Sequence, residues 1–256
     1  MSKISKPADG LAWVTGASSG IGREVAAQLA QAGWTVIISA RGQAGLESLA
    51  AQHPGRMLVA PMDITDAQAV RAGLAQVQAQ SGRNIVRAVL NAGTYERDTA
   101  RDFNVARFKT QVEVNLLGTA HCLEALLPGL LAAGAGQIGV VSSLSGLAGL
   151  PGAVSYSTTK AGLIAMCQSL KFDMDRAGVG ISVILPGFVR TPLTDKNTFP
   201  MPYIMTVETA ARAIISGLDS GRFIIAFPAA LAWPLRVLRI LPAPVFFAVL
   251  ARATKW

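Results

Sequence analysis

Tyr156 and Lys160 are the side chains of this sequence best suited to proton transfer. They lie four residues apart in Tyr-Ser-Thr-Thr-Lys, so a helix would place both on one face. A tyrosine hydroxyl has a pKa of about 10, and a nearby ammonium lowers that pKa because it favours the phenolate. Thirteen residues earlier, Ser143 follows an apolar run and could bring a further hydroxyl to the same cleft. The alternative is a capping serine and an ordinary exposed tyrosine–lysine pair.

A glycine-rich stretch near the N-terminus predicts a binding site for a ligand that carries phosphate. Glycine permits a tight turn and close approach of a phosphate, and the N-terminus of a helix favours its negative charge. The pattern alone is weak, because ordinary strand-to-helix turns look similar, but here it stands between an apolar run and a helical pattern. The residues predicted to contact a dinucleotide here are Gly16, Ser18, Ser19, Gly20, Ile21 and Gly22.

The end of the second predicted strand, at Arg41, bears on which dinucleotide binds. A site selective for NAD usually holds the ribose 2′-hydroxyl with an acidic side chain at this point. No acid occurs from Val25 to Gln43, whereas Arg41 offers a planar cation that suits a 2′-phosphate. We therefore predict NADP(H) as the preferred cofactor. NAD(H), with Arg41 as a solvent-exposed loop residue, is the alternative.

These residues need a scaffold that gathers the ends of several strands. Short apolar runs alternate with helix-like stretches, and no long Ser/Pro/Gly linker divides the chain. This alternation predicts an α/β fold with a doubly wound parallel sheet and a ligand crevice at the carboxyl ends of the strands. The predicted strands are Leu11–Thr15, Trp34–Ser39, Met57–Ala60, Val86–Leu90, Gln137–Ser142 and Gly180–Leu185. The predicted helices include Gly22–Ala32, Asp66–Ala79, Val105–Ala133 and Ser155–Ala177.

Taken together, these motifs resemble the short-chain dehydrogenase/reductase family, in the single-domain subgroup of about this length. The matching elements follow the order and spacing of the family from about Leu11 to Phe227. They are Thr15–Gly22, Asp63, Asn91-Ala92-Gly93, Asn115, Ser143, Tyr156 with Lys160, and Pro186-Gly187 with Thr191. The resemblance implies a Rossmann-type sheet of about seven strands with helices on both faces. One departure is Leu90, where many relatives have a second asparagine.

The resemblance also implies a role for each matching residue. Tyr156 would donate or accept the proton, and Ser143 would hydrogen-bond the substrate oxygen. Lys160 would bind the nicotinamide ribose and lower the pKa of Tyr156, and Asn115 would hold a water in a proton relay. The cofactor contacts implied beyond the glycine-rich stretch are Asp63, Ile64, Asn91, Ala92, Gly93, Tyr156, Lys160, Pro186, Gly187, Val189 and Thr191.

A substrate lid is expected at residues 191–206, which are rich in proline at one end and apolar at the other. In this family the stretch covers the substrate, and lids exclude water from the reaction. Met201 and Tyr203 are the predicted substrate contacts, and with Met205 they favour a lipophilic substrate. The alternative is that these side chains only pack against the following helix, which Thr206 would cap.

The positive charge is concentrated at the C-terminus. The chain has 23 basic and 15 acidic residues and a net charge of +8, and residues 220–256 hold five basic residues and no acid. We predict a dinucleotide-binding catalytic domain at residues 1–228, with residues 229–256 as an apolar and basic extension of the same domain. Its uncharged runs are shorter than the ~18 residues of a spanning helix, so a peripheral contact with an anionic membrane surface is favoured. Packing over the substrate cleft and a subunit contact are the alternatives. The side chains concerned are Trp233, Arg236, Arg239, Phe246, Phe247, Arg252, Lys255 and Trp256.

Composition excludes several other classes of protein. With 51% apolar and 15% charged residues the chain is neither disordered nor fibrous. Its two cysteines and two histidines give neither a disulfide scaffold nor metal-ligand spacing, so no metal site is expected. No apolar signal core follows the N-terminus, so we expect a cytoplasmic protein, peripherally placed at the inner membrane surface. The cations form no extended patch, so nucleic acid is not expected as a partner.

The leading functional hypothesis is an NADP-dependent oxidoreductase that interconverts a carbonyl and a secondary alcohol on an apolar small molecule. A homodimer or homotetramer is expected, because helices Val105–Ala133 and Ser155–Ala177 match those that form the common interface in this family. The rival hypothesis is a non-catalytic nucleotide-binding sensor or a membrane-surface interaction module. The complete set Asn115, Ser143, Tyr156 and Lys160 argues against it, since a sensor needs no positioned proton donor.

Overall fold

Seven parallel strands form a single sheet in the computed structural model, which describes residues 4–195, 197 and 199–254. Their order is β3-β2-β1-β4-β5-β6-β7, so the chain reverses direction across the sheet between β1 and β4, where a crevice is expected to open. The predicted doubly wound sheet is thereby confirmed. The strands are β1 (Leu11–Thr15), β2 (Val36–Ser39), β3 (Met57–Val59), β4 (Ile85–Leu90), β5 (Gln137–Val141), β6 (Gly180–Pro186) and β7 (Ile224–Phe227).

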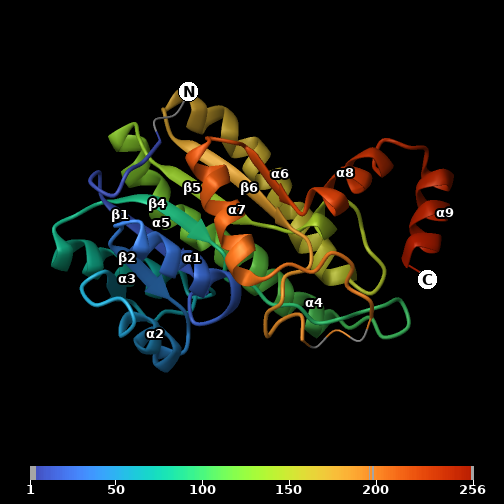
Figure 1. Cartoon of the computed structure of the whole chain (residues 1–256), viewed down its shortest axis with the longest axis horizontal. Helices are drawn as coiled ribbons and strands as arrows, with labels where there is room; N and C mark the ends of the chain where they lie inside the picture. Colours follow the sequence, from blue (N-terminus) through green and yellow to red (C-terminus); the bar gives the residue numbers. More distant parts are fainter. Residues whose placement is uncertain (1–3, 196, 198, 255–256) are drawn as a thin grey trace.

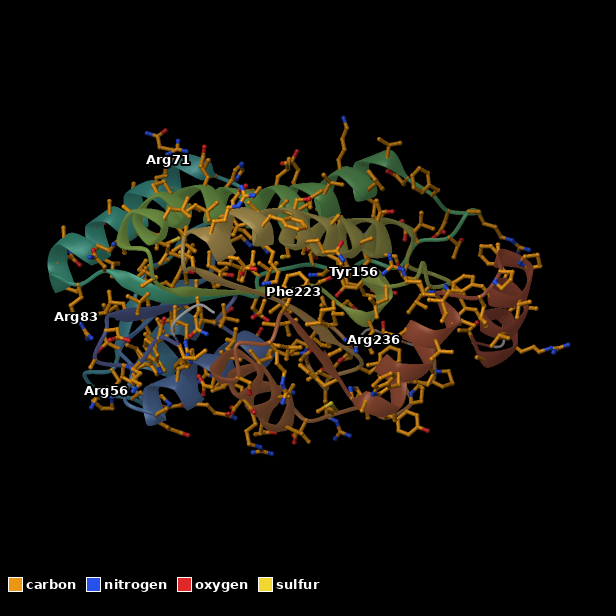
Figure 2. The ribbon with its side chains drawn as sticks, turned by 90° about the horizontal axis from the view of Figure 1, so that it is seen from above. Arg56, Arg71, Arg83, Tyr156, Phe223 and Arg236 are labelled. Atoms are coloured by element: carbon orange, nitrogen blue, oxygen red, sulfur yellow. The ribbon has the colours of Figure 1, made fainter. Side chains whose placement is uncertain are left out.

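Helices cover both faces of the sheet, which is why the strands are apolar on both sides. One layer contains α1 (Gly20–Gln31), α2 (Gln43–Ala50) and α7 (Val207–Asp219). The other contains α3 (Ala67–Ser81), α5 (Gly118–Ala133) and α6 (Val154–Arg176) (Figure 2). Residue boundaries differ from the predictions by one or two positions, and the sequence did not locate α2 or β7. β7 was missed because its four residues merge into the apolar run that follows them.

The helix predicted at Val105–Ala133 is not a uniform α-helix. It consists of α4 (Val105–Gln111), a π-helical stretch at Val112–Leu117, and α5. π-helical turns are uncommon and occur frequently at functional sites, and this one contains Asn115. By length and hydropathy this is the one candidate membrane span among the described residues. In the fold it packs on the sheet through Cys122, Leu123, Leu126 and Leu130.

The C-terminal extension forms two further helices, α8 (Ala229–Leu238) and α9 (Ala243–Thr254), at one end of the molecule (Figure 1). α8 packs on the body through Ala232, while Leu231 and Leu235 lie against the same core. α9 projects away from the sheet, and most of its apolar side chains are exposed (Figure 1). Lys255 and Trp256, which belong to the predicted basic and aromatic stripe, lie outside the described residues.

Candidate active site

The carboxyl ends of β4 and β5 bring the four predicted catalytic residues together. Ser143 follows β5, and its hydroxyl lies near enough to that of Tyr156, in the first turn of α6, to act on the pKa of the tyrosine. Lys160 lies one turn further along α6, with its Nζ 5.5 Å from the centre of the Tyr156 ring. Gly93, just after β4, lies beside both the Lys160 ammonium and the Asn115 side chain, and an added Cβ there would meet both. The predicted clustering is therefore present.

The Tyr156 hydroxyl is held in its neutral form. The pKa of Tyr156 is raised to about 12, chiefly because burial disfavours the phenolate; the nearby Tyr95 adds to the increase and the Ser143 hydroxyl opposes it. The ring of Tyr95 packs edge-on against that of Tyr156, with 5.1 Å between ring centres. The sequence led us to expect a pKa lowered by Lys160, but burial is the largest effect on the pKa of Tyr156 in this structure, and it acts in the opposite direction. A neutral phenol is suited to donate a proton to a substrate oxygen.

Lys160 is buried, and its ammonium lies beside Gly93. Its Nζ donates a hydrogen bond to the carbonyl oxygen of Val141 at 2.9 Å. Burial lowers the pKa of Lys160 to about 8, because the charged form loses water. An ammonium has three donors, so two remain for other partners, such as a bound ligand.

The Asn115 side chain makes hydrogen bonds with the loop after β4 and with α6. Its Oδ1 accepts from the Thr94 N–H at 2.7 Å, and its Nδ2 donates to Thr94 O at 2.9 Å and to the Thr159 hydroxyl at 3.1 Å. Its backbone carbonyl accepts from the Thr119 hydroxyl at 2.8 Å. Three of the four hydrogen-bonding positions of the side chain are therefore used in holding the site together, and the predicted water relay stays a prediction.

The glycine-rich stretch forms a cradle into which a pyrophosphate fits. Gly16 and Gly20 have positive φ angles, which other residues rarely adopt. An added Cβ at Gly22 would lie 2.4 Å from Asn91 Nδ2 and from Gly16 O, so only glycine allows this close packing. The N-cap residue of α1, Ser19, makes no side-chain capping bond, and no acid stands in the first turn. The N–H groups of that turn are therefore suited to an anion.

The adenosine end of the predicted site lies beyond β2 and β3. Asp63 Oδ1 accepts from the Thr65 N–H at 2.9 Å and from its hydroxyl at 2.8 Å. The backbone hydrogen bond from Thr65 chiefly lowers the pKa of Asp63, and the charge of the exposed Arg41 contributes. Arg41 therefore lies near enough to Asp63 for its charge to act on that carboxylate. The Ile64 side chain is instead buried against Gly118 of α5, so only its backbone could reach a cofactor.

At the other end of the cradle, the segment after β6 approaches the glycine-rich stretch. The Thr191 side chain lies against Gly20, so an added Cβ there would meet it. Gly187 contacts Leu231 of α8 and Leu144, the neighbour of Ser143. The start of α8 therefore borders the catalytic cleft. Pro186 and Val189 belong to the same segment and are buried.

The predicted lid divides into an anchored and an open part. Met205 is anchored, because its N–H donates to Phe188 O and its carbonyl accepts from Arg190 N, both at 2.9 Å. Thr206 caps α7 as expected, accepting from the Thr209 N–H at 3.3 Å. Tyr203 is 63% exposed and Met201 is half-buried, so these two remain available to a substrate. Met205 serves as packing.

Three residues of the site escaped the sequence analysis. Tyr95 packs on the catalytic ring, Thr159 binds Asn115, and the buried Asp98 binds the residue before Tyr156. Thr159 could have been inferred from its place beside Lys160. Tyr95 and Asp98 stand in a loop with no motif of its own, so spacing gave no signal. Across the described residues, no group of three or more His, Cys, Asp or Glu side chains could hold a metal ion.

Comparison with known proteins agrees with this geometry. The short chain dehydrogenase family profile matches residues 11–200. A Myxococcus xanthus protein described as an uncharacterized oxidoreductase is 36% identical over 245 residues, which are 94% of this chain and 96% of that protein. A 3-oxoacyl-(acyl-carrier-protein) reductase of Staphylococcus aureus is 33% identical over 72% of this chain and 76% of its own length. A short-chain dehydrogenase structure from Streptomyces avermitilis is 26% identical, with a TM-score of 0.81 and 96% coverage of both chains. The chain belongs to the short-chain dehydrogenase family of NAD(P)-dependent oxidoreductases.

Proposed function

We propose that this protein reduces the carbonyl group of an apolar small molecule with NADPH and catalyses the reverse oxidation. The observation that carries the proposal is the Tyr156 hydroxyl, which burial keeps neutral, beside the Ser143 hydroxyl and with the Lys160 Nζ 5.5 Å from the centre of its ring. The bound nicotinamide supplies the hydride that adds to the carbonyl carbon. As the carbonyl bond becomes single, Ser143 donates a hydrogen bond to its oxygen and Tyr156 transfers its proton there, giving the alcohol. Lys160 orients the ribose and stabilises the phenolate left on Tyr156.

The experiment is NADPH oxidation, followed by absorbance, with three classes of carbonyl compound. A long-chain methyl ketone and an acetoacetyl thioester test the apolar class, and dihydroxyacetone serves as the small polar control. We expect turnover of an apolar carbonyl with a kcat/KM well above that of the control. NADPH binding without turnover of any carbonyl would favour the non-catalytic sensor instead.

The preference for NADPH is expected to depend on Arg41, which is exposed beside Asp63. Removing a charge-assisted contact with a phosphate costs roughly 1.5–3 kcal/mol, or about ten- to a hundredfold in affinity. Arg41→Ala should weaken NADPH binding by that factor and leave NADH binding nearly unchanged, as measured by fluorescence titration. Arg56→Ala is a matched control, because Arg56 is exposed and binds only Gly33 O. Equal weakening of both dinucleotides would make Arg41 a structural residue and remove the case for NADP.

The C-terminal extension supports a second proposal, that the protein binds an anionic membrane surface without spanning the bilayer. α8, α9 and the turn between them carry seven exposed large apolar side chains, and residues 220–256 contain no acid to repel anionic lipid. Apolar side chains with basic neighbours are typical of an interfacial helix. The exposed apolar residues are Trp233, Val237, Ile240, Leu241, Val245, Phe247 and Val249. Because α8 also borders the cleft, an apolar substrate could pass from the lipid surface to Tyr156.

Replacing both Arg239 and Arg252 by glutamine should weaken binding to phosphatidylserine vesicles by about thirtyfold at low salt, since each charge near such a surface contributes roughly 1 kcal/mol. Co-sedimentation measures the effect. Arg56→Gln with Arg71→Gln is the matched control, because it removes the same charge from exposed arginines at the opposite end of the molecule (Figure 2). If the wild-type protein ignores these vesicles, or if both double variants weaken binding equally, the membrane proposal fails.

A homodimer or homotetramer through the layer of α5 and α6 remains part of the proposal. Phe172 on α6 is 73% exposed, and Leu117 and Leu131 are exposed on the neighbouring helix. Exposed apolar side chains on a helical layer are commonly buried against a second copy of the chain in a symmetric assembly. Light scattering should give an oligomer at micromolar concentration, and Phe172→Asp should shift it toward the monomer. A wild-type protein that is wholly monomeric would contradict the expectation.

A further inference from the structure

Asp98 is a fully buried carboxylate to which the proposed reaction gives no part. It lies in the loop after β4 and binds Ser155, the residue immediately before Tyr156. The N–H of Ser155 donates to the two carboxylate oxygens at 3.2 and 3.0 Å, and the Ser155 hydroxyl also donates to Oδ2. Burying a carboxylate is costly unless its oxygens are hydrogen-bonded, and here Ser155 satisfies them from two sides.

The hydrogen bonds from Ser155 to Asp98 take the place of a side-chain cap at the start of α6. The helix begins at Val154, and its N-cap position is Ala153, which has no side chain able to accept a hydrogen bond. The first N–H groups of a helix need acceptors, and an acid there also interacts favourably with the helix dipole. Asp98 supplies both the hydrogen-bond acceptor and the negative charge, although it is 57 residues from Ser155 along the chain. The turn that it caps contains Tyr156.

Hydrogen bonds join the loop that carries Asp98 to two parts of the active site. The N–H of Asp98 and the hydroxyl of Tyr95 both donate to Gly152 O, each at 3.3 Å, so the loop pairs with the residues that precede α6. At its start, Thr94 exchanges two hydrogen bonds with the Asn115 side chain. The segment Thr94–Asp98 therefore connects Asn115 directly to the turn that bears Tyr156.

We propose that Asp98 is a positioning residue for Tyr156. By fixing the first turn of α6, it holds the Tyr156 hydroxyl at the Ser143 hydroxyl and at the place where the substrate oxygen must arrive. A misplacement of about 1 Å in a reacting group can cost about a hundredfold in rate. The inference rests on the proposed function, because the position of Tyr156 matters to turnover only if that residue transfers the proton.

The first test compares Asp98→Asn with two matched aspartate variants. Asp102→Asn changes an exposed acid of the same loop, which binds the N–H and hydroxyl of Thr99 at 2.7 and 2.6 Å. Asp66→Asn changes the N-cap of α3, which accepts from Gln68 and Ala69. Asp98→Asn should lower kcat for the best carbonyl substrate about tenfold or more, while the Kd for NADPH changes less than about twofold. Both controls should keep the wild-type kcat. An unchanged kcat, or the same fall in the controls, overturns the inference.

Ser155→Ala keeps the test decisive if Asp98→Asn folds poorly. It removes only the hydroxyl contact and leaves the backbone N–H bond, so a smaller fall in kcat is expected. The double variant, Asp98→Asn with Ser155→Ala, should have the same kcat as Asp98→Asn alone, because both changes break the same contact. Additive losses would show that Asp98 acts elsewhere and would overturn the inference.

Amide hydrogen exchange in the free protein gives a readout that needs no substrate. Asp98→Asn should accelerate exchange in residues 152–157, and Asp102→Asn should not, because only Asp98 caps this turn. Unchanged exchange overturns the inference even if no carbonyl substrate is found. A wild-type protein that oxidises no NADPH, with exchange accelerated as expected, would instead overturn the proposed function alone.

Discussion

Tyr156→Phe is expected to lower kcat by a factor of about 10²–10⁴, because it removes the hydroxyl that we propose transfers its proton to the substrate oxygen. The ring and its edge-on contact with Tyr95 remain, so the cleft should keep its shape. NADPH binding should be nearly unchanged, since the cradle formed by α1 and the glycine-rich stretch is untouched. Single-turnover kinetics with saturating NADPH separate the chemical step from binding.

Tyr95→Phe is the matched control for this result. It also deletes one phenolic hydroxyl beside the same ring, but that hydroxyl donates to Gly152 O and not toward the cleft. Its effect on kcat should be far smaller than that of Tyr156→Phe. If Tyr156→Phe retains turnover within a few-fold of the wild type, the proton must come from another group, and the proposed mechanism is wrong.

Lys160→Met should damage both turnover and cofactor affinity, because a single ammonium is placed to serve both. Methionine fills much of the same buried volume, whereas alanine would leave a cavity. The variant loses the hydrogen bond to Val141 O and the charge beside the Tyr156 ring. We expect kcat to fall about a hundredfold and the Kd for NADPH to rise about tenfold or more, as hydrogen bonds with charged groups contribute roughly 1.5–3 kcal/mol. Unchanged NADPH affinity would show that Lys160 does not contact the ribose.

The same variant has a signature in the pH dependence of stability. Burial lowers the pKa of Lys160 from 10.5 to about 8, so between these values the unfolded chain binds the additional proton. The free energy of unfolding of the wild type relative to Lys160→Met should therefore increase as pH rises from about 8 to 10, by at most about 1.4 kcal/mol per unit.

The buried thiols of Cys122 and Cys167 act in the opposite direction. Burial raises the pKa of each from 9.0 to about 12, so they lower stability as the pH rises above about 9. Both thiols are present in the wild type and in the variant, so their contributions cancel in the difference. Urea unfolding at several pH values measures the difference in unfolding free energy between the wild type and Lys160→Met. A difference that does not change with pH would mean that Lys160 titrates as it does in the unfolded chain.

The sequence by itself determined the parts of this protein whose residues are close together along the chain. The stretch Thr15–Gly22 needs glycine at the turn and lies between a strand and a helix, so its function follows from local geometry. Tyr156 and Lys160 share a face because they are one helical turn apart. Strands buried on both faces are rich in apolar residues, and this made six of the seven recognisable.

Only the tertiary structure decided what depends on contacts between distant segments. Asp98 and Ser155 are 57 residues apart, and no local pattern shows that one caps the helix of the other. Arg87 belongs to β4 yet is almost fully buried, because Asp219 and Gln137 neutralise and hydrogen-bond it from other elements. No pattern in the sequence indicated the π-helical turn at Val112–Leu117, which contains Asn115. The pKa of Tyr156 is raised and not lowered, because burial is a property of the whole fold, whereas the spacing to Lys160 specifies only one neighbour.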